Sequence, residues 1–107
     1  KHEIMSFVNC QSSLMLEWEV MFKELALNIE SNVQLKYKDK VALYNMLGHL
    51  NKKSNQIDRT MHERMIQTAG QMRSILSEIS IIKQLSEENW KSRIIRCYTL
   101  SETFDGT

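Results

Sequence analysis

The 107-residue chain contains no proline and only three glycines. At average usage, about five prolines would be expected in a chain of this length. β-Sandwiches, barrels and loop-rich folds use Pro and Gly at their many turns, so their scarcity argues against those classes. Apolar residues make up 42% of the chain and charged residues 25%, which is a folded composition. We therefore predict an all-α fold built from long helices.

An excess of either charge is also lacking. Lys and Arg number 14 and Asp and Glu number 13, which gives a net charge of +1. Nucleic-acid-binding domains are typically strongly basic, so a nucleic-acid partner is not expected. The weak exception is the group Lys36, Lys38 and Lys40, which Asp39 interrupts.

Long apolar runs and closely spaced cysteines are missing as well. No segment approaches the ~18 apolar residues of a membrane span, and the first ten residues lack the features of a signal peptide. The two cysteines, Cys10 and Cys97, have no metal-binding or redox spacing. We predict an intracellular protein of the nucleus or cytoplasm without a membrane span. Because the chain begins at Lys1, we expect a fragment of a larger protein.

Apolar residues instead follow one helical phase through most of the chain, at about 100° per residue. Between Met61 and Ile82 the positions of this phase, with Thr68 among them, advance by alternating steps of four and three, as in a coiled-coil seam. We call this set the principal stripe and predict that it forms an oligomer or partner interface, with the tryptophans as anchors. Its members are Leu14, Trp18, Phe22, Leu25, Ile29, Leu43, Leu47, Leu50, Ile57, Met61, Met65, Met72, Ile75, Ile79, Ile82, Trp90 and Ile94.

Two polar segments, residues 30–42 and 51–55, weaken the principal stripe. They leave two architectures for a single segment spanning 1–107. One is a nearly continuous helix of ~95 residues and ~140 Å. The other is a helical hairpin that bends at 51–55, with arms of ~45 residues, and it would place Met46 opposite Met61 and Leu25 opposite Ile82. Either would form a coiled-coil-like oligomeric bundle.

A second apolar set, the outer line, lies on roughly the opposite side of the same helical wheel. It comprises Leu16, Val20, Leu27, Val41, Ile66, Ile81 and Ile95. A two-stranded coil would leave these residues in water, so we expect at least three helices in cross-section, brought together by self-association or by another helical protein. Asn28, Asn32 and Asn89 lie near the seam, where buried asparagines can fix register.

Residue patterns for catalysis or cofactor binding are not found in the sequence. His62-Glu63 begins a zinc-protease motif, but position 66 is Ile where the second histidine ligand is required. Asp58 and His62, one helical turn apart, would supply only two metal ligands. No glycine-rich phosphate loop occurs. We predict no enzymatic activity, no catalytic or metal-ligating residues, no cofactor and no small-molecule substrate.

The predicted function is therefore association. The leading hypothesis is a non-enzymatic self-association and protein-protein interaction module of an intracellular structural scaffold, binding copies of itself or another helical protein. The alternative is a compact, monomeric helical-bundle adaptor that binds a partner helix in an apolar groove. The two hypotheses differ in where the principal stripe lies: between chains in the first, and inside one chain in the second.

Overall fold

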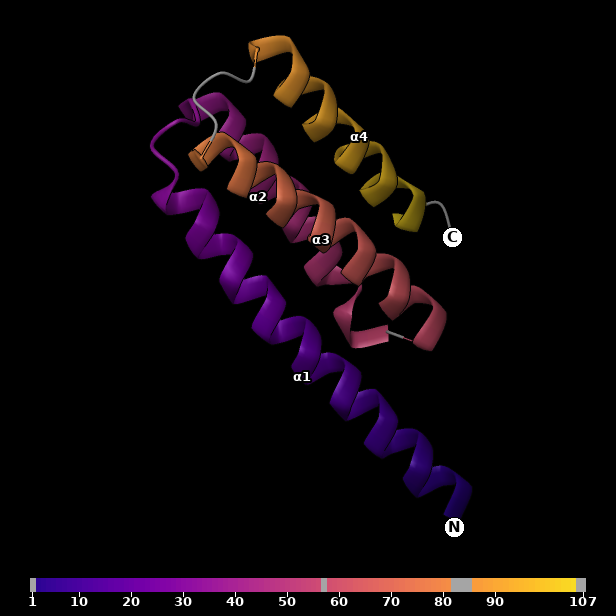
Figure 1. Ribbon diagram of the computed structural model, residues 1–107. Helices are drawn as coiled ribbons and strands as arrows, with labels where there is room; N and C mark the ends of the chain where they lie inside the picture. Colours follow the sequence, from indigo (N-terminus) through magenta and orange to yellow (C-terminus); the bar gives the residue numbers. More distant parts are fainter. Residues whose placement is uncertain (1, 57, 82–85, 106–107) are drawn as a thin grey trace.

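A computed structural model describes the backbone of residues 2–56, 58–81 and 86–105, and the side chains of residues 12–56, 58–80 and 86–102. Within this part the chain forms four α-helices and no strands (Figure 1). The helices are α1 (His2–Ser31), α2 (Tyr37–Lys52), α3 (Arg59–Ile81) and α4 (Glu87–Asp105), and a short 3₁₀-helix, η1 (Ser54–Gln56), follows α2. The all-α prediction is confirmed.

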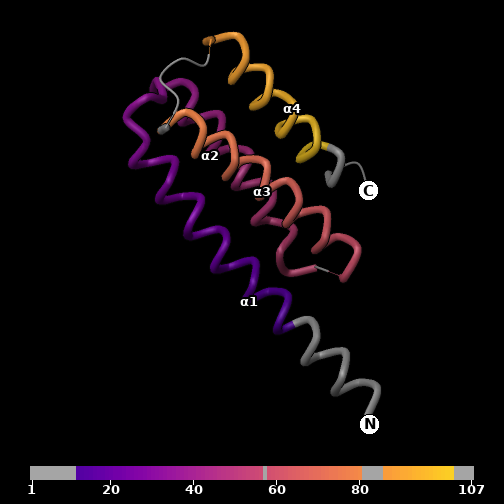
Figure 2. Tube along the Cα trace, viewed as in Figure 1, coloured from indigo at the N-terminus to yellow at the C-terminus, as the bar shows by residue number. Residues whose placement is uncertain are grey.

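The helices form a bundle in which α1 and α4 each pack against α2 and α3. Glu17 contacts His62, and Glu24 contacts Arg73, so α1 and α3 run in the same direction. The contacts of Glu78 with Arg93 and of Gln71 with Cys97 show that α3 and α4 run antiparallel. The chain thus goes up, down, up and down along the bundle, with α2 diagonal to α3 (Figure 2).

The chain does not form one continuous helix. It turns at residues 32–36 and 53–58, at or beside the two weak segments of the principal stripe. At the first turn, Asn32 Oδ1 accepts a hydrogen bond from the backbone N–H of Gln34 at 3.0 Å. At the second, Asp58 Oδ1 accepts from the backbone N–H of Met61 at 2.8 Å and caps the start of α3. Asp58 thus satisfies an N–H group that the start of a helix exposes, and Asn32 forms a side-chain turn within the connection between α1 and α2.

The predicted reversal near residues 51–55 is present, but the hairpin register is wrong. Glu24 lies beside Arg73, so the neighbouring Leu25 packs near the middle of α3. The predicted register would place Leu25 at the carboxyl end of α3 instead. A hairpin requires two antiparallel arms, whereas the additional turns divide each arm and leave α1 parallel to α3. Met46 and Met61 belong to the diagonal helices α2 and α3, and Ile82 lies outside the described residues.

The principal stripe forms the core of this single chain. Of its members, Leu14, Trp18, Leu25, Ile29, Leu43, Leu47, Leu50, Met65, Met72, Ile75, Ile79, Trp90 and Ile94 are buried, while Phe22 and Met61 are half-buried against them. Ile57, like Ile82, lies outside the described residues. Fully burying one Leu, Ile or Met side chain stabilises the folded state by about 1.5–3 kcal/mol. One chain therefore removes most of the stripe from water without a partner.

Polar contacts join the helix ends. Trp18 Nε1 donates a hydrogen bond to Asn51 Oδ1 at 3.3 Å, which links α1 to the end of α2. At the opposite end of the bundle, Glu87 of α4 pairs with Lys36 at 2.9 Å and with Lys91 at 3.2 Å. The hydrogen bonds from these lysines lower the pKa of Glu87, and Glu87 raises the pKa of Lys36.

None of the described helices is long and apolar enough to cross a membrane.

Candidate interaction groove between α1 and α3

The outer line emerges on the surface of the bundle. Leu16, Val20 and Leu27 project from the side of α1 opposite the core and are 62–65% exposed. Elsewhere on the line, Ile95 of α4 is 64% exposed and Val41 of α2 is less so. Three large aliphatic side chains on one helix face form an apolar strip that no described part of the chain covers.

A groove runs beside this strip, between the parallel helices α1 and α3. We call it the α1/α3 groove; it has a volume of about 420 Å³. Its lining residues are Ser13, Leu16, Glu17, Val20, Met21, Glu24 and Ile66. Ile66, also a member of the outer line, is half-buried against the core, so the aliphatic residues of α1 and α3 meet in one place. Ile81, the remaining member, has a side chain outside the described set.

Farther along the same pair of helices lies a second, more polar depression of about 230 Å³. We call it the polar hollow; it is lined by Asn28, Ser31, Asn32, Leu76, Ser77 and Ser80. Because an α-helix rises 1.5 Å per residue, the distance along α1 from Ser13 to Ser31 is about 27 Å. The seam between α1 and α3 thus offers an apolar segment followed by a polar one.

Two carboxylates give the α1/α3 groove its charge. Glu17 Oε2 lies 3.2 Å from Nε2 of His62, and the Glu17 side chain remains 62% exposed. Glu24 Oε1 lies 3.4 Å from Nε of Arg73 and remains 44% exposed. No basic side chain belongs to the lining. The lining is therefore mostly apolar with two carboxylates, and Arg73 partly offsets the charge of Glu24.

His62, the partner of Glu17, is a buried polar side chain beside the groove. Its side chain is 7% exposed, and Nδ1 has no hydrogen-bond partner among the described residues. Asp58, the other half of the weak metal pattern, caps α3 instead. No group of three or more His, Cys, Asp or Glu side chains in the described part of the chain is arranged to hold a metal ion.

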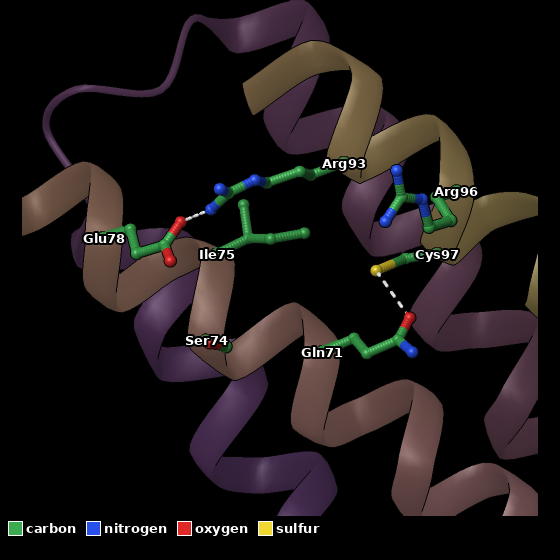
Figure 3. A pocket seen from close by; sticks show the side chains of 7 residues that line it. All are labelled: Gln71, Ser74, Ile75, Glu78, Arg93, Arg96 and Cys97. Carbon is green, nitrogen blue, oxygen red and sulfur yellow. Dashed lines mark hydrogen bonds and ion pairs between the residues drawn. The ribbon is translucent and has the colours of Figure 1, made fainter. Parts of the chain in front are cut away.

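A third depression, of about 310 Å³, lies between α3 and α4 and is lined by Gln71, Ser74, Ile75, Glu78, Arg93, Arg96 and Cys97 (Figure 3). Four of its polar side chains pair with one another. Arg93 pairs with Glu78, and the Cys97 thiol lies 3.7 Å from Gln71 Oε1. Burial raises the pKa of Cys97 to about 11, against a smaller opposing effect of Arg96. The thiol is thus protonated at neutral pH and is a poor nucleophile.

The basic group of residues 36–40 is also engaged within the molecule. Lys36 pairs with Glu87, and Lys40 Nζ donates to the backbone carbonyl of Glu30 at 2.8 Å. Asp39 is buried. Two of the three lysines therefore stabilise the bundle ends, which weakens the nucleic-acid alternative.

The sequence predicted the aliphatic members of the groove but not its carboxylates. Leu16, Val20 and Ile66 share the outer line, whereas Glu17 and Glu24 resemble any exposed acidic residues of an amphipathic helix. Their signal was the spacing of seven residues, which places both on one side of a helix. The chain matches no protein-family model, no curated protein and no solved structure.

Proposed function

We propose that this chain is a non-enzymatic protein-interaction module that binds an amphipathic helix of a partner in the α1/α3 groove. The observation that carries this proposal is the exposed strip of Leu16, Val20 and Leu27 beside a groove of about 420 Å³. Amphipathic helices bind such grooves through apolar residues spaced three and four apart. A bound helix would remove from water the aliphatic groups that the bundle leaves exposed.

The principal stripe is not needed for this binding. Its residues lie inside one chain, so a second chain reaches them only if the bundle opens, at the cost of the core. The α1/α3 groove is accessible while the bundle stays folded. This favours the compact adaptor over the extended self-associating segment. A role in an intracellular scaffold stays a prediction from the cysteine spacing and the absence of a membrane span.

Self-association is the second candidate function, now through the outer face of α1. The three exposed aliphatic residues of that helix favour it, because two copies placed face to face would cover one another. In this case the mass of the particle in solution would rise with concentration.

A binding titration tests the proposed function. The probe is a fluorescent 18-residue amphipathic peptide with leucines at helical spacing and no net charge. We expect the Leu16→Ser/Val20→Ser double variant to bind at least about tenfold more weakly, because two apolar contacts are lost. Ile95→Ser, which changes an equally exposed residue on α4, is the matched control and should bind normally. Equal binding by all three proteins, or none by the wild type, would overturn the proposal.

A further inference from the structure

The charges of the α1/α3 groove indicate the chemistry of the helix that it fits. Glu17 and Glu24 are seven residues apart, or about 10.5 Å along the axis of α1. Both remain partly exposed after pairing with His62 and Arg73. A helix lying along the groove would present side chains seven residues apart at the same interval. Lys or Arg at those two positions would pair with both carboxylates, whereas acidic residues would be repelled.

The direction of the bound helix follows from the parallel arrangement of α1 and α3. Both helices end near the polar hollow, and the carboxyl end of a helix carries a partial negative charge. The amino end of a third helix carries the opposite partial charge and exposes N–H groups that need acceptors. An antiparallel helix therefore matches the field of this pair, while a parallel one would place three like ends together.

The polar hollow also supplies suitable acceptors. Ser31 Oγ donates to the carbonyl of Leu27 at 2.8 Å, and Ser80 Oγ donates to the carbonyl of Leu76 at 3.0 Å. A hydroxyl that donates its proton keeps oxygen lone pairs that can accept. Side-chain oxygens of this kind are those that usually satisfy the first N–H groups of a helix.

We propose that the ligand of the α1/α3 groove is a basic amphipathic helix of about 18 residues, bound antiparallel to α1 and α3. This inference rests on the proposed function and specifies its partner. The basic residues of the ligand, seven positions apart, contact Glu17 and Glu24, and its apolar residues cover Leu16, Val20 and Ile66. Its amino-terminal turn lies at the polar hollow.

Matched peptides test the charge. Two 18-residue peptides share one leucine face and differ only at two positions seven apart, which carry Lys in one and Glu in the other. We expect the Lys peptide to bind about tenfold more tightly at low ionic strength, with a smaller difference at about 1 M salt. Glu17→Gln/Glu24→Gln should abolish the difference and Arg73→Gln should enlarge it. Glu88→Gln, a change on α4 away from the groove, should leave it unaltered.

A spin label on the Lys peptide tests the direction. A nitroxide at the peptide amino terminus should broaden the amide resonances of Ser31 and Ser80, and one at the carboxyl terminus those of Ser13 and Ile66. Far-ultraviolet circular dichroism and melting temperature verify that each variant is folded, since all the changed side chains are at least partly exposed.

The possible failures are distinguishable. Equal affinity for the Lys and Glu peptides would overturn the basic ligand and leave helix binding in place, and a reversed broadening pattern would overturn the antiparallel direction. No binding of either peptide would overturn the proposed function as well. Displacement of a concentration-dependent dimer by the peptide would identify a second copy as the natural occupant and also overturn the inference.

Discussion

At the residue scale, Asn32 shows how a buried polar side chain can hold two helices together. It is 5% exposed. Its Nδ2 donates to the carbonyl of Leu76 at 3.2 Å and to Ser80 Oγ at 3.4 Å, while Oδ1 accepts from the N–H of Gln34. Asn32 thus follows the end of α1 and fixes the position of α1 along α3 within one chain. The sequence predicted instead that it fixes register between chains.

The first prediction concerns Asn32→Leu. In an oligomeric seam, removal of a polar residue would raise stability. In this bundle it leaves the N–H of Gln34 without its partner and removes two contacts to α3, so we expect unfolding free energy to fall by about 1–3 kcal/mol. Chemical denaturation measures the change. Asn89→Ala, at an exposed position, is the control and should change stability by less than about 0.5 kcal/mol. A more stable Asn32→Leu protein would contradict the role assigned here.

The second prediction concerns Cys97, whose side chain is 1% exposed. Burial raises the pKa of its thiol from an ordinary value of 9.0 to about 11, so the unfolded chain loses this proton at lower pH than the folded chain does. The thiol's contribution to stability is therefore complete below pH 9 and declines as the pH rises to about 11. The full shift corresponds to roughly 2–3 kcal/mol.

Denaturation curves at pH 8 and pH 10.5 check this expectation. Lys and Tyr residues also titrate in that range, so the informative quantity is the loss of stability in the wild type minus the loss in Cys97→Ala. A positive difference supports the buried thiol. An identical loss in the two proteins would show that Cys97 ionises as readily in the folded bundle as in the unfolded chain.

At the scale of elements, α1 has two apolar faces with different roles. Leu25, on the principal stripe, is fully buried, whereas Leu27, on the outer line, is 65% exposed. We expect Leu25→Ala to lower unfolding free energy by about 2–5 kcal/mol, because it removes core contacts and leaves a cavity. Leu27→Ala should have little effect. The pair is matched in residue type and in helix, so thermal and chemical denaturation of the two variants separate core from surface. Equal losses would contradict the two-faced helix.

How far the sequence predicted these elements depends on what periodicity measures. Spacing identifies which residues share a helix face, and it placed 13 of the principal-stripe residues that are now found buried. It also located two of the three places at which the chain reverses, but it missed the reversal between α3 and α4. It could not predict which helices become neighbours, because any two apolar stripes can pair in some register. The sequence therefore could not predict that Glu24 contacts Arg73 between two parallel helices. For the same reason it could not predict the acidic groove that α1 and α3 form.

At the scale of the whole molecule, the side chains single out one of two parallel helix pairs. Antiparallel neighbours, such as α1 and α2 or α3 and α4, offset each other's end charges, whereas the parallel pairs, α1 with α3 and α2 with α4, place like ends side by side. Of these two pairs, α1 and α3 carry the exposed aliphatic strip and both groove carboxylates. An additional antiparallel helix would offset the end charges and cover the strip at once, so the topology and the side chains favour the same ligand.

The last prediction is the shape of the isolated chain in solution. A globular domain of this length has an expected radius of gyration of about 13 Å, and the Cα atoms of this bundle give 15.3 Å, with extents of 56 × 26 × 18 Å. A rod of ~140 Å would give about 40 Å. We expect small-angle X-ray scattering to give a radius close to the bundle value, and light scattering to give the 12.6 kDa of one chain at low concentration. A radius near 40 Å would contradict the bundle. A compact particle of twice the mass, reduced to one chain by Leu16→Ser/Val20→Ser, would instead favour self-association through the outer face of α1.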